Sequence, residues 1–290
     1  METLCWINHR VVPADQAAIP VMDHGLLYGD GIFEGLRFYH GRVFKLEQHL
    51  RRLERSARAI ALQLPYPLDE IASILNQVVT QYPAPSGYLR LVVTRGAGNL
   101  GINPRHCRQP SLFVIAGSLQ VVSAAARGGI DLHLASTRRV PAECLDPRVK
   151  SLNYLNNILA RIEAHQVGAD EAVMLNTRGF VTEGTVDNIF IVDGGVLATP
   201  PLSAGILDGI TRGCILEIAA RAGIACVERA LTAYDLLNAD ECFLSGTGAE
   251  LIAVQSIDRQ PLRDPERPLF HRIERLFQAH IEECCAGLVC

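Results

Sequence analysis

Short runs of β-branched residues alternate with stretches of helical apolar periodicity along most of this 290-residue chain, and this alternation limits the fold more than any other feature. In the first third, apolar residues recur at spacings of four and three, the pattern of one helical stripe. They are Leu46, Leu50, Leu53, Ala57 and Ile60. A second helix is predicted over 68–82, and its predicted end is set by Pro83 and Pro85, which do not continue a helix. Two runs bounded by glycine and proline predict strands, GYLRLVVTR from Gly87 and SLFVIAG from Ser111, so this third is predicted to be a small α+β unit.

A stretch of small residues without strong pattern, QVVSAAARGG at 120–129, predicts a linker between two domains. We therefore expect a small N-terminal α+β domain over 1–119 and a larger domain over 130–290. In the larger domain, alternation from Ile130 predicts a strand, and SLNYLNNILARIEAHQVG predicts a helix that Gly168 stops. Further strands are predicted for EAVMLN, GFVTEG, NIFIV, VLATP, ECFLSG and LIAVQSI, and further helices for ITRGCILEIAARAG, AYDLLNA and PLFHRIERLFQAHIEECC.

Charge and composition narrow the classes of function. The net charge of -4, with both signs scattered, leaves no basic stripe for a phosphate backbone, so we expect no nucleic-acid partner. No apolar run is long enough to span a bilayer, and the start METLCWINHR lacks the apolar core and cleavage site of a secretion signal. We expect a cytoplasmic protein with small-molecule ligands and no membrane partner. The nine cysteines show no CxxC spacing, so we expect reduced thiols and no metal.

The scarcity of lysine singles out one candidate nucleophile. Of the 27 basic residues only Lys45 and Lys150 are lysines. Arginine cannot replace them in amine chemistry, because its guanidinium stays protonated, whereas a buried lysine can lose its proton and attack a carbonyl. Lys45 opens a helix crowded with charged residues, where an amine stays solvated and charged. Lys150 closes the run DPRVK before the apolar Leu152 and Leu155, so it is the predicted nucleophile, although a lysine at a helix start is most often a plain surface residue.

A carboxylate, two glycine turns and an arginine are further candidate ligand-binding features, each with an ordinary structural alternative. Glu183 lies between two strands in TEGTVDNIF, where it could hold a proton on a pyridine nitrogen or be an ordinary turn carboxylate. In LDGITRGC the turn at Gly209 feeds a helix near Thr211, whose N–H groups and dipole favour a phosphate. In SGTGAE a strand ends in a glycine turn with a hydroxyl at Thr247, and both turns could also be plain connectors. Arg52 could supply a fixed cation for the phosphate or be a surface arginine.

Seven blocks, in the order of the chain, resemble the motifs of one family. They are DHGLLYGDGIFEGLR, EQHLRRLERSA, YLRLVVTRG, VKSLNYLNN, VTEGTVDNIFIV, LDGITR and FLSGTGAEL. Over almost its whole length the chain resembles the fold type IV pyridoxal-phosphate enzymes, which include branched-chain and D-amino-acid aminotransferases and aminodeoxychorismate lyase. The resemblance implies an α+β, two-domain fold, with a small N-terminal α/β domain and a larger cofactor-binding domain whose β-barrel-like core is flanked by helices.

The resemblance also implies roles for single residues. The catalytic residue Lys150 would carry pyridoxal 5'-phosphate as a Schiff base, and Glu183 would pair with the pyridine nitrogen. Tyr154 would hydrogen-bond the ring hydroxyl, and Leu207 would pack on the ring. The phosphate would be held by Arg52, Gly209, Ile210, Thr211 and Thr247.

A second set of residues would bind the substrate. The set implied by the resemblance is Tyr28, Phe33, Arg37, Tyr88, Arg90, Arg95, Gly248 and Ala249. Tyr28, Phe33 and Tyr88 would form an apolar side pocket, while Arg90 would answer the distal carboxylate of glutamate or 2-oxoglutarate. The blocks around these residues resemble the branched-chain enzymes, so the expected reaction moves the amino group of leucine, isoleucine or valine to 2-oxoglutarate.

Several alternatives stay open from the sequence. A D-amino-acid aminotransferase is one, because the VTRG block with Arg95 also occurs in those enzymes, and a 4-amino-4-deoxychorismate lyase on the same scaffold is another. Val186 and Asp208 stand where the family commonly has a small residue and a proline. From other classes, a non-catalytic cofactor-binding protein and a thiol hydrolase are the alternatives. The resemblance implies a homodimer or higher homo-oligomer, with each active site between the two domains and partly covered by a loop of the partner.

Overall fold

The computed structural model describes residues 3–118 and 128–286. By its internal contacts the chain divides into two compact units. The first comprises the described residues of Met1–Gln120, Val149–Asn153 and Ile281–Cys290, and the second those of Val121–Arg148 and Tyr154–His280. The predicted linker, residues 120–129, lies largely outside the described residues. The short segment that carries Lys150 belongs with the N-terminal unit, although a single division of the sequence near residue 120 assigns it to the larger domain.

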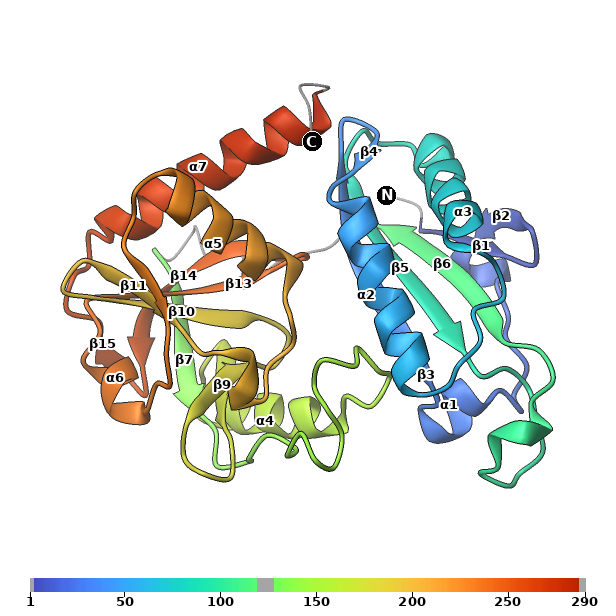
Figure 1. Ribbon diagram of the computed structural model, residues 1–290, viewed down its shortest axis with the longest axis horizontal. Helices are drawn as coiled ribbons and strands as arrows, with labels where there is room; N and C mark the ends of the chain where they lie inside the picture. Colours follow the sequence, from blue (N-terminus) through green and yellow to red (C-terminus); the bar gives the residue numbers. More distant parts are fainter. Residues whose placement is uncertain (1–2, 119–127, 287–290) are drawn as a thin grey trace. The chain divides into compact units, whose positions relative to one another are not determined.

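The first unit is built on a six-stranded antiparallel sheet (Figure 1). In spatial order its strands are β2 (Arg10–Pro13), β1 (Leu4–Ile7), β6 (Ser111–Gly117), β5 (Gly87–Thr94), β3 (Gly31–Tyr39) and β4 (Arg42–Val43). Helices α2 (Leu46–Ala59) and α3 (Leu68–Gln81) cover one face of this sheet and share one core with it. Leu53 of α2, Leu75 of α3 and Leu89 of β5 are fully buried there, so the predicted apolar stripe of α2 is confirmed.

Side chains of β3 alternate between the two faces of the sheet, as the period of an extended strand requires. Ile32 and Leu36 point into the core beneath the helices, and Glu34 follows the same alternation. Phe33 lies on the opposite face. The antiparallel register of β3 with β5 places Arg90 on that opposite face as well. A short helix, α1 (His24–Tyr28), precedes β3, and the Asp23 side chain caps it by accepting from the Gly25 N–H.

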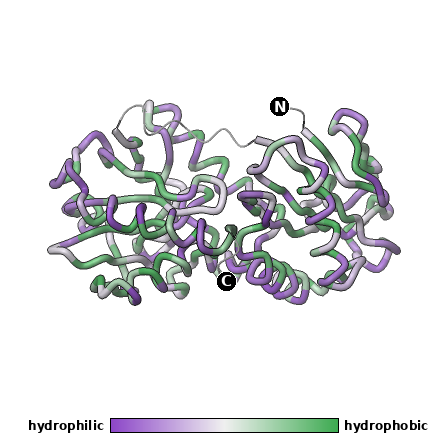
Figure 2. Tube along the Cα trace, turned by 90° about the horizontal axis from the view of Figure 1, so that it is seen from above, coloured by the Kyte–Doolittle hydropathy of each residue, from purple (hydrophilic) through white to green (hydrophobic). Residues whose placement is uncertain are grey.

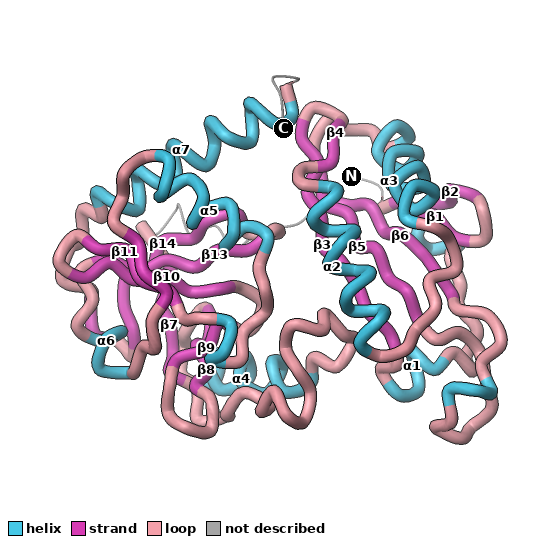
Figure 3. The backbone as a smooth tube through the Cα atoms, in the orientation of Figure 1, coloured by secondary structure: helices cyan, strands magenta, loops and turns pink. Residues whose placement is uncertain are grey.

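The second unit is built on a nine-stranded sheet of mixed direction (Figures 1 and 3). Eight strands follow the order β12 (Cys226–Glu228), β11 (Val196–Thr199), β10 (Asn188–Asp193), β13 (Glu241–Gly246), β14 (Glu250–Ile257), β7 (Ile130–Leu134), β8 (Glu171–Leu175) and β9 (Val181–Gly184), and β15 (Gln260–Pro261) pairs with β14. The last strand, β9, also contacts β10, and the Gly184 N–H donates to the Asp187 carbonyl at 2.7 Å. The sheet therefore curls back on itself.

Helices pack on this curled sheet, and their bounds are α4 (Leu155–Gln166), α5 (Ile210–Arg221), α6 (Ala233–Leu237) and α7 (Pro268–Cys285). Ala160 of α4 packs on β8, while Ile215 of α5 packs on the stacked rings of Phe190 and Phe243, whose centres are 5.1 Å apart. Glu241 accepts the first N–H groups of α7 and so fixes its start. Figure 2 shows hydrophobic segments inside each unit and hydrophilic ones around them.

The predicted fold class is confirmed, and so is nearly every predicted element. The exception is the start of α4, which was expected near Ser151 but lies at Leu155, because the residues before it pair with β3. Among the described residues, seven cysteines are free, whereas Cys284 is disulfide-bonded, so the expectation of reduced thiols is wrong at that position. Within the described ranges, no helix is long and apolar enough to cross a bilayer.

Candidate active site

The segment that carries Lys150 runs along an edge of β3 like a short extra strand. The Lys150 carbonyl accepts from the Phe33 N–H at 3.0 Å, and the Leu152 N–H donates to the Gly31 carbonyl at 3.0 Å. The Lys150 N–H donates to the Ser56 hydroxyl of α2 at 3.2 Å. These bonds fix the backbone, so the amine extends from a sheet edge and not from a solvated helix start.

One face of this sheet, opposite α2 and α3, gathers an amine, a guanidinium and two aromatic rings. Lys150 Nζ is 4.6 Å from the centre of the Phe33 ring, and the Arg90 guanidinium carbon is 4.6 Å from the same centre. Arg90 also lies 5.7 Å from the centre of the Tyr88 ring. A Cβ on Gly35 would lie 2.2 Å from the Tyr88 hydroxyl, so only glycine leaves room for that ring. The first unit thus brings four predicted site residues together.

On the helix-covered face, Arg52 is held by a carboxylate that the sequence did not single out. Arg52 Nε and Nη2 donate to the two oxygens of Glu34 at 2.8 and 2.7 Å, a bidentate pair. His49 Nδ1 lies 2.8 Å from one of these oxygens. All three side chains are almost completely buried. Arg52 is therefore not a surface arginine, and its guanidinium is oriented by Glu34.

Burial and charge act together on the titration of this cluster. Burial raises the pKa of Glu34, but the charge and hydrogen bonds of Arg52, helped by His49, outweigh it and lower the pKa to about 2. Burial lowers the pKa of His49 below its ordinary value, the hydrogen bond to Glu34 opposes this, and the charges of Arg52 and Lys150 add to the lowering. His49 is therefore neutral and Glu34 ionised at neutral pH.

In the second unit, three donors surround the carboxylate of Glu183 at the end of β9. Arg139 Nη2 donates to one oxygen at 2.7 Å, while Asn188 Nδ2 and the Leu207 N–H donate to the other at 3.1 and 2.9 Å. Glu183 is 5% exposed. A solvated turn carboxylate would be bonded mainly to water. Because Glu183 is buried and accepts from three protein donors, it is not a carboxylate of that kind.

The two predicted phosphate turns meet around Asn188. Gly209 is the N-cap of α5 and offers no side-chain cap, so the first N–H groups of the helix have no partner within it. A Cβ on Gly209 would lie 1.9 Å from Asn188 Oδ1. Asn188 stands opposite Ser245 in the pairing of β10 with β13, and a Cβ on Gly246 would lie 2.1 Å from Asp187 Oδ1. Glycine at both turns therefore leaves room for the side-chain oxygens of Asn188 and Asp187.

Four other predicted residues lie at the ends of helices or in a turn. Tyr154 is the N-cap of α4 and partly exposed. Gly248 and Ala249 form, with Thr247, the turn between β13 and β14. Tyr28 ends α1, and its hydroxyl donates to the Leu100 carbonyl, so it lies against the loop after β5.

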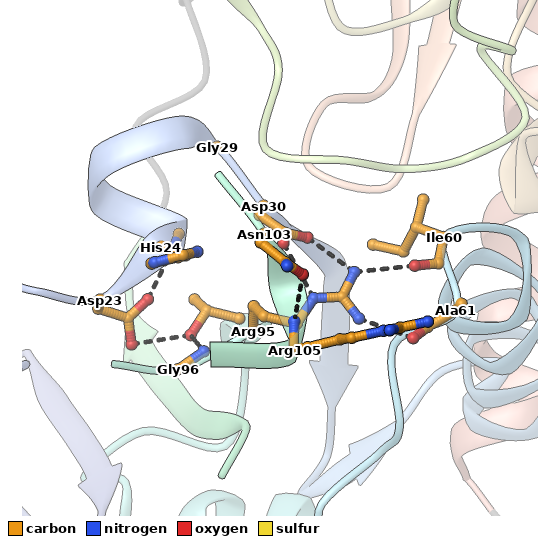
Figure 4. A network of polar contacts seen from close by, with 12 residues as sticks. Asp23, His24, Gly29, Asp30, Ile60, Ala61, Arg95, Gly96, Asn103 and Arg105 are labelled. Carbon is orange, nitrogen blue, oxygen red and sulfur yellow. Dashed lines mark hydrogen bonds and ion pairs between the residues drawn. The ribbon is translucent and has the colours of Figure 1, made fainter. Parts of the chain in front are cut away.

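Two predicted substrate arginines differ in what holds them. The guanidinium carbon of Arg37, on β3, lies 5.4 Å from the centre of the Tyr39 ring. Arg95 is tied into the first unit: Nε and Nη2 donate to Asp30 at 2.9 Å each, Nη2 donates to the Ile60 carbonyl at 2.8 Å, and Nη1 to the Ala61 carbonyl at 2.7 Å (Figure 4). These bonds join the end of β5 to the end of α2 and use four of the five guanidinium N–H groups. The contacts favour a structural role for Arg95.

Several polar residues of the candidate site, buried or partly buried, were not predicted from the sequence. They are Glu34, His49, Arg139 and Asn188. The sequence contains a pattern that could have indicated Glu34 and another that could have indicated His49. Glu34 is an even number of positions from the buried Ile32 and Leu36, so it lies on the core face of β3. His49, Arg52 and Ser56 recur at spacings of three and four and form a buried polar stripe beside the apolar stripe of α2. For Arg139 and Asn188 the sequence offers no comparable pattern.

The two sets of residues have complementary chemistry. The first unit offers an amine beside an apolar ring and a guanidinium. An amine of this kind can add to a carbonyl, and a guanidinium can pair with a carboxylate. The second unit offers a buried carboxylate, able to hold a proton on a ring nitrogen, and N–H groups that suit a phosphate.

Comparisons with known proteins agree with this chemistry. The family profile described as amino-transferase class IV matches residues 31–257. A protein of Methanocaldococcus jannaschii, provisionally named a branched-chain-amino-acid aminotransferase, is 44% identical over 261 residues, 90% of each chain. The D-alanine aminotransferase of Listeria monocytogenes is 34% identical over 295 residues, 98% of each chain. The solved structure of the branched-chain amino acid aminotransferase from Thermobaculum terrenum, in its PLP-bound holo-form, matches with a TM-score of 0.86 at 30% identity, over 99% of this chain and 96% of that one.

Proposed function

Because the chain belongs to the class IV aminotransferases, which are pyridoxal-phosphate-dependent enzymes, we propose that it moves the amino group of leucine, isoleucine or valine to 2-oxoglutarate. The observation that carries the proposal lies on one sheet face, where Lys150 Nζ and the Arg90 guanidinium each approach the Phe33 ring to 4.6 Å. The apolar ring suits the side chain of a branched amino acid, and the guanidinium suits the distal carboxylate of a dicarboxylic oxo acid. The amine would take part in the reaction of both substrates.

The residues of the second unit fit the phosphate of the cofactor. The start of α5 has no side-chain cap, and within the described residues the buried Ser245 hydroxyl has no partner, so polar groups are available for phosphate oxygens. Glycine at positions 209 and 246 lets the side-chain oxygens of Asn188 and Asp187 lie against these turns, closer than a Cβ would allow. The proposed phosphate ligands are Arg52, Gly209, Ile210, Thr211 and Thr247.

The ring of the cofactor would be held by three further residues. Glu183 would bond the ring nitrogen, Tyr154 the ring hydroxyl, and Leu207 would pack on the ring. When bound, the cofactor supplies a carbonyl that an amine can attack and a ring that withdraws electrons from the substrate. Lys150 is the amine to which it would be attached. The ionised Glu183 would keep the ring nitrogen protonated, which strengthens that withdrawal.

The amine of Lys150 would act twice in the reaction. It would hold the cofactor until the amino acid binds, and it would then move the proton that is released from the substrate α-carbon. The amino group would pass from the amino acid to the cofactor and then to 2-oxoglutarate, so that a 2-oxo acid and glutamate would be the two products. Attachment of the Lys150 backbone to β3 and α2 keeps the amine within reach of one face of the substrate.

The substrate pocket would use both apolar and cationic side chains. Phe33, Tyr28 and Tyr88 would contact the branched side chain, and Arg90 would pair with the distal carboxylate of 2-oxoglutarate. The remaining proposed substrate contacts are Arg37, Gly248 and Ala249. Arg95 is left out, because its guanidinium is engaged by Asp30 and two carbonyls.

We also propose that the enzyme is at least a homodimer. The loop to which the Tyr28 hydroxyl is bonded exposes large apolar side chains, with Leu100 at 73% and Ile102 at 80% exposure. Leu26 of the neighbouring α1 is 60% exposed. Apolar groups gathered on one surface are favourably covered by another chain, and a second copy of this chain is the partner that the resemblance implies.

Gly209→Ala is expected to weaken binding of pyridoxal phosphate by roughly tenfold or more, the equivalent of one lost hydrogen bond to a charged group. The added Cβ would meet Asn188 Oδ1 at 1.9 Å, and Asn188 is tied to Glu183 and to the Leu207 carbonyl. The matched control is Gly213→Ala in the same helix, where a Cβ meets nothing within 4 Å. Titration of the cofactor-free proteins measures both, and equal affinities for the two variants would contradict the proposed phosphate site.

The nearest alternative function is that of a D-amino-acid aminotransferase, and the 34% identity to a D-alanine aminotransferase favours it. The handedness of the preferred substrate distinguishes this alternative from the proposed function. L-leucine and D-alanine are added separately to the cofactor-loaded protein, and the change in the cofactor spectrum is followed without a second substrate. We expect L-leucine to react roughly 100-fold faster, the scale on which a shaped pocket discriminates. A faster reaction with D-alanine would replace the proposal by its rival.

A further inference from the structure

Arg139, in the segment between β7 and α4, makes a partly buried ion pair with the carboxylate assigned to the cofactor ring. Its Nη2 donates to Glu183 Oε1 at 2.7 Å, and its Nη1 donates to Asn157 Oδ1 at 2.8 Å. The side chains of Arg139 and Glu183 are only 12% and 6% exposed. A planar guanidinium bound at two of its nitrogens has one orientation, so Arg139 meets Glu183 from a fixed direction.

The backbone around Arg139 is fixed as firmly as its side chain. The Arg139 N–H donates to the Leu175 carbonyl at the end of β8, at 2.9 Å. Asn156 of α4 bonds to the backbone of both residues that flank Arg139. Its Oδ1 accepts from the Val140 N–H at 3.1 Å, and its Nδ2 donates to the Arg138 carbonyl at 2.9 Å. The next residue of α4, Asn157, receives the guanidinium. Two consecutive asparagines thus hold one arginine.

The other oxygen of Glu183 is bound from a different side. Asn188 Nδ2 and the Leu207 N–H donate to Oε2, while Arg139 donates to Oε1. Donors on both oxygens prevent rotation of the carboxylate about its last bond. Arg139 supplies the only formal positive charge among these three donors. Its loss would leave a buried carboxylate without the charge that offsets its desolvation.

We propose that Arg139 is a positioning residue, which holds the Glu183 carboxylate ionised and aimed at the ring nitrogen of the cofactor. The inference rests on the proposed function, because it concerns the carboxylate that would bond this nitrogen. Arg139 touches neither the cofactor nor the substrate in this role. It acts through Glu183, and its effect depends on whether the ligand has a ring nitrogen to bond.

A purely structural role for Arg139 makes a different prediction. If Arg139 only joined the segment after β7 to α4, its replacement would weaken the binding of every cofactor analogue alike. If it positions Glu183, the loss is concentrated on ligands that have the ring nitrogen. Pyridoxal phosphate and its 1-deaza analogue, in which C–H replaces this nitrogen, differ in that atom and keep the same phosphate and aldehyde.

The experiment measures the dissociation constants of both ligands for the cofactor-free full-length protein and three variants. Wild type is expected to prefer pyridoxal phosphate over the deaza analogue by roughly 10- to 100-fold, the range for a hydrogen bond to a charged group. Arg139→Gln should reduce this preference about tenfold. Arg139→Lys keeps the charge but not the planar guanidinium, so its preference should lie between those of wild type and Arg139→Gln. The control is Arg138→Gln, whose guanidinium donates to the Ala135 carbonyl, and it should keep the full preference.

Each outcome separates the inference from the proposed function. Failure of the wild-type protein to bind pyridoxal phosphate would reject the proposed function itself. A wild-type preference that survives unchanged in Arg139→Gln, or parallel weakening of both ligands, would overturn only the role of Arg139. If Arg139→Gln does not fold, Arg139→Lys decides the question by the same ratio, because an unchanged preference there combined with weaker binding of both ligands indicates a structural role.

Discussion

Lys150→Ala is expected to lower kcat by at least about 10³-fold, because one amine serves both as the attachment point of the cofactor and as the proton carrier. The only other lysine of the chain, Lys45, is the N-cap of α2 and lies 5.9 Å from the centre of the Phe44 ring, where it cannot replace the missing group. Steady-state rates with L-leucine and 2-oxoglutarate measure the loss. A small primary amine added to the solution should restore part of the rate, since it supplies the missing base.

The matched control for this prediction is Lys45→Ala, which should keep its rate within about twofold of wild type. The melting temperature of both variants shows whether the protein is still folded. Turnover by folded Lys150→Ala at a rate close to wild type would remove Lys150 from the mechanism.

Glu34→Gln is expected to destabilise the protein by about 3–5 kcal/mol at pH 7, because it leaves the buried Arg52 guanidinium without a counter-charge. Glu34 is fully buried and accepts from both Nε and Nη2 of Arg52. Denaturant unfolding measures the difference. The control is Glu47→Gln on the same helix as Arg52, where an exposed pair with Arg51 contributes less than about 1 kcal/mol. Similar losses in the two variants would show that burial does not distinguish the pairs.

The same substitution has a signed pH dependence. The pKa of Glu34 falls from its ordinary 4.5 to about 2 on folding, so the unfolded chain binds the proton first as pH decreases. The stabilisation by Glu34 is therefore complete above pH 4.5 and is lost between pH 4.5 and about 2. The difference between wild type and Glu34→Gln should shrink across this window. A difference that grows as the pH falls would contradict the assigned ionisation.

Much of the fold follows from periodicity, since helices and strands bury side chains at their own spacings. Leu50, Leu53 and Ala57 are buried where the stripe of α2 predicts, and the predicted helix stop at Gly168 has the positive φ, +80°, that favours glycine. The start of α4 was misplaced, because the residues after Lys150 pair with a strand far away in the sequence. Local propensity does not contain that pairing.

The site was predictable where a residue type limits the chemistry, and less so where a partner decides the role. Lys150 was predicted from the scarcity of lysine, and Glu183 from its place between two strands and from the family motif that this segment resembles. The predicted cation Arg52 is bound by a buried carboxylate, Glu34, and the predicted substrate ligand Arg95 is bound by a partly exposed one, Asp30. Such partners are set by tertiary packing. The sequence therefore indicates that the arginine is a candidate site residue but does not indicate which carboxylate binds it.

Lys150 is the proposed attachment point of the cofactor, and the attachment point can be identified directly. The yellow, cofactor-loaded protein is treated with borohydride, which converts a reversible link between an amine and the cofactor into a stable one, and the peptides are then analysed by mass spectrometry. We expect the cofactor adduct on the peptide that contains Lys150 and none on the peptide that contains Lys45. An adduct on Lys45, or bound cofactor with neither lysine modified, would contradict this proposal.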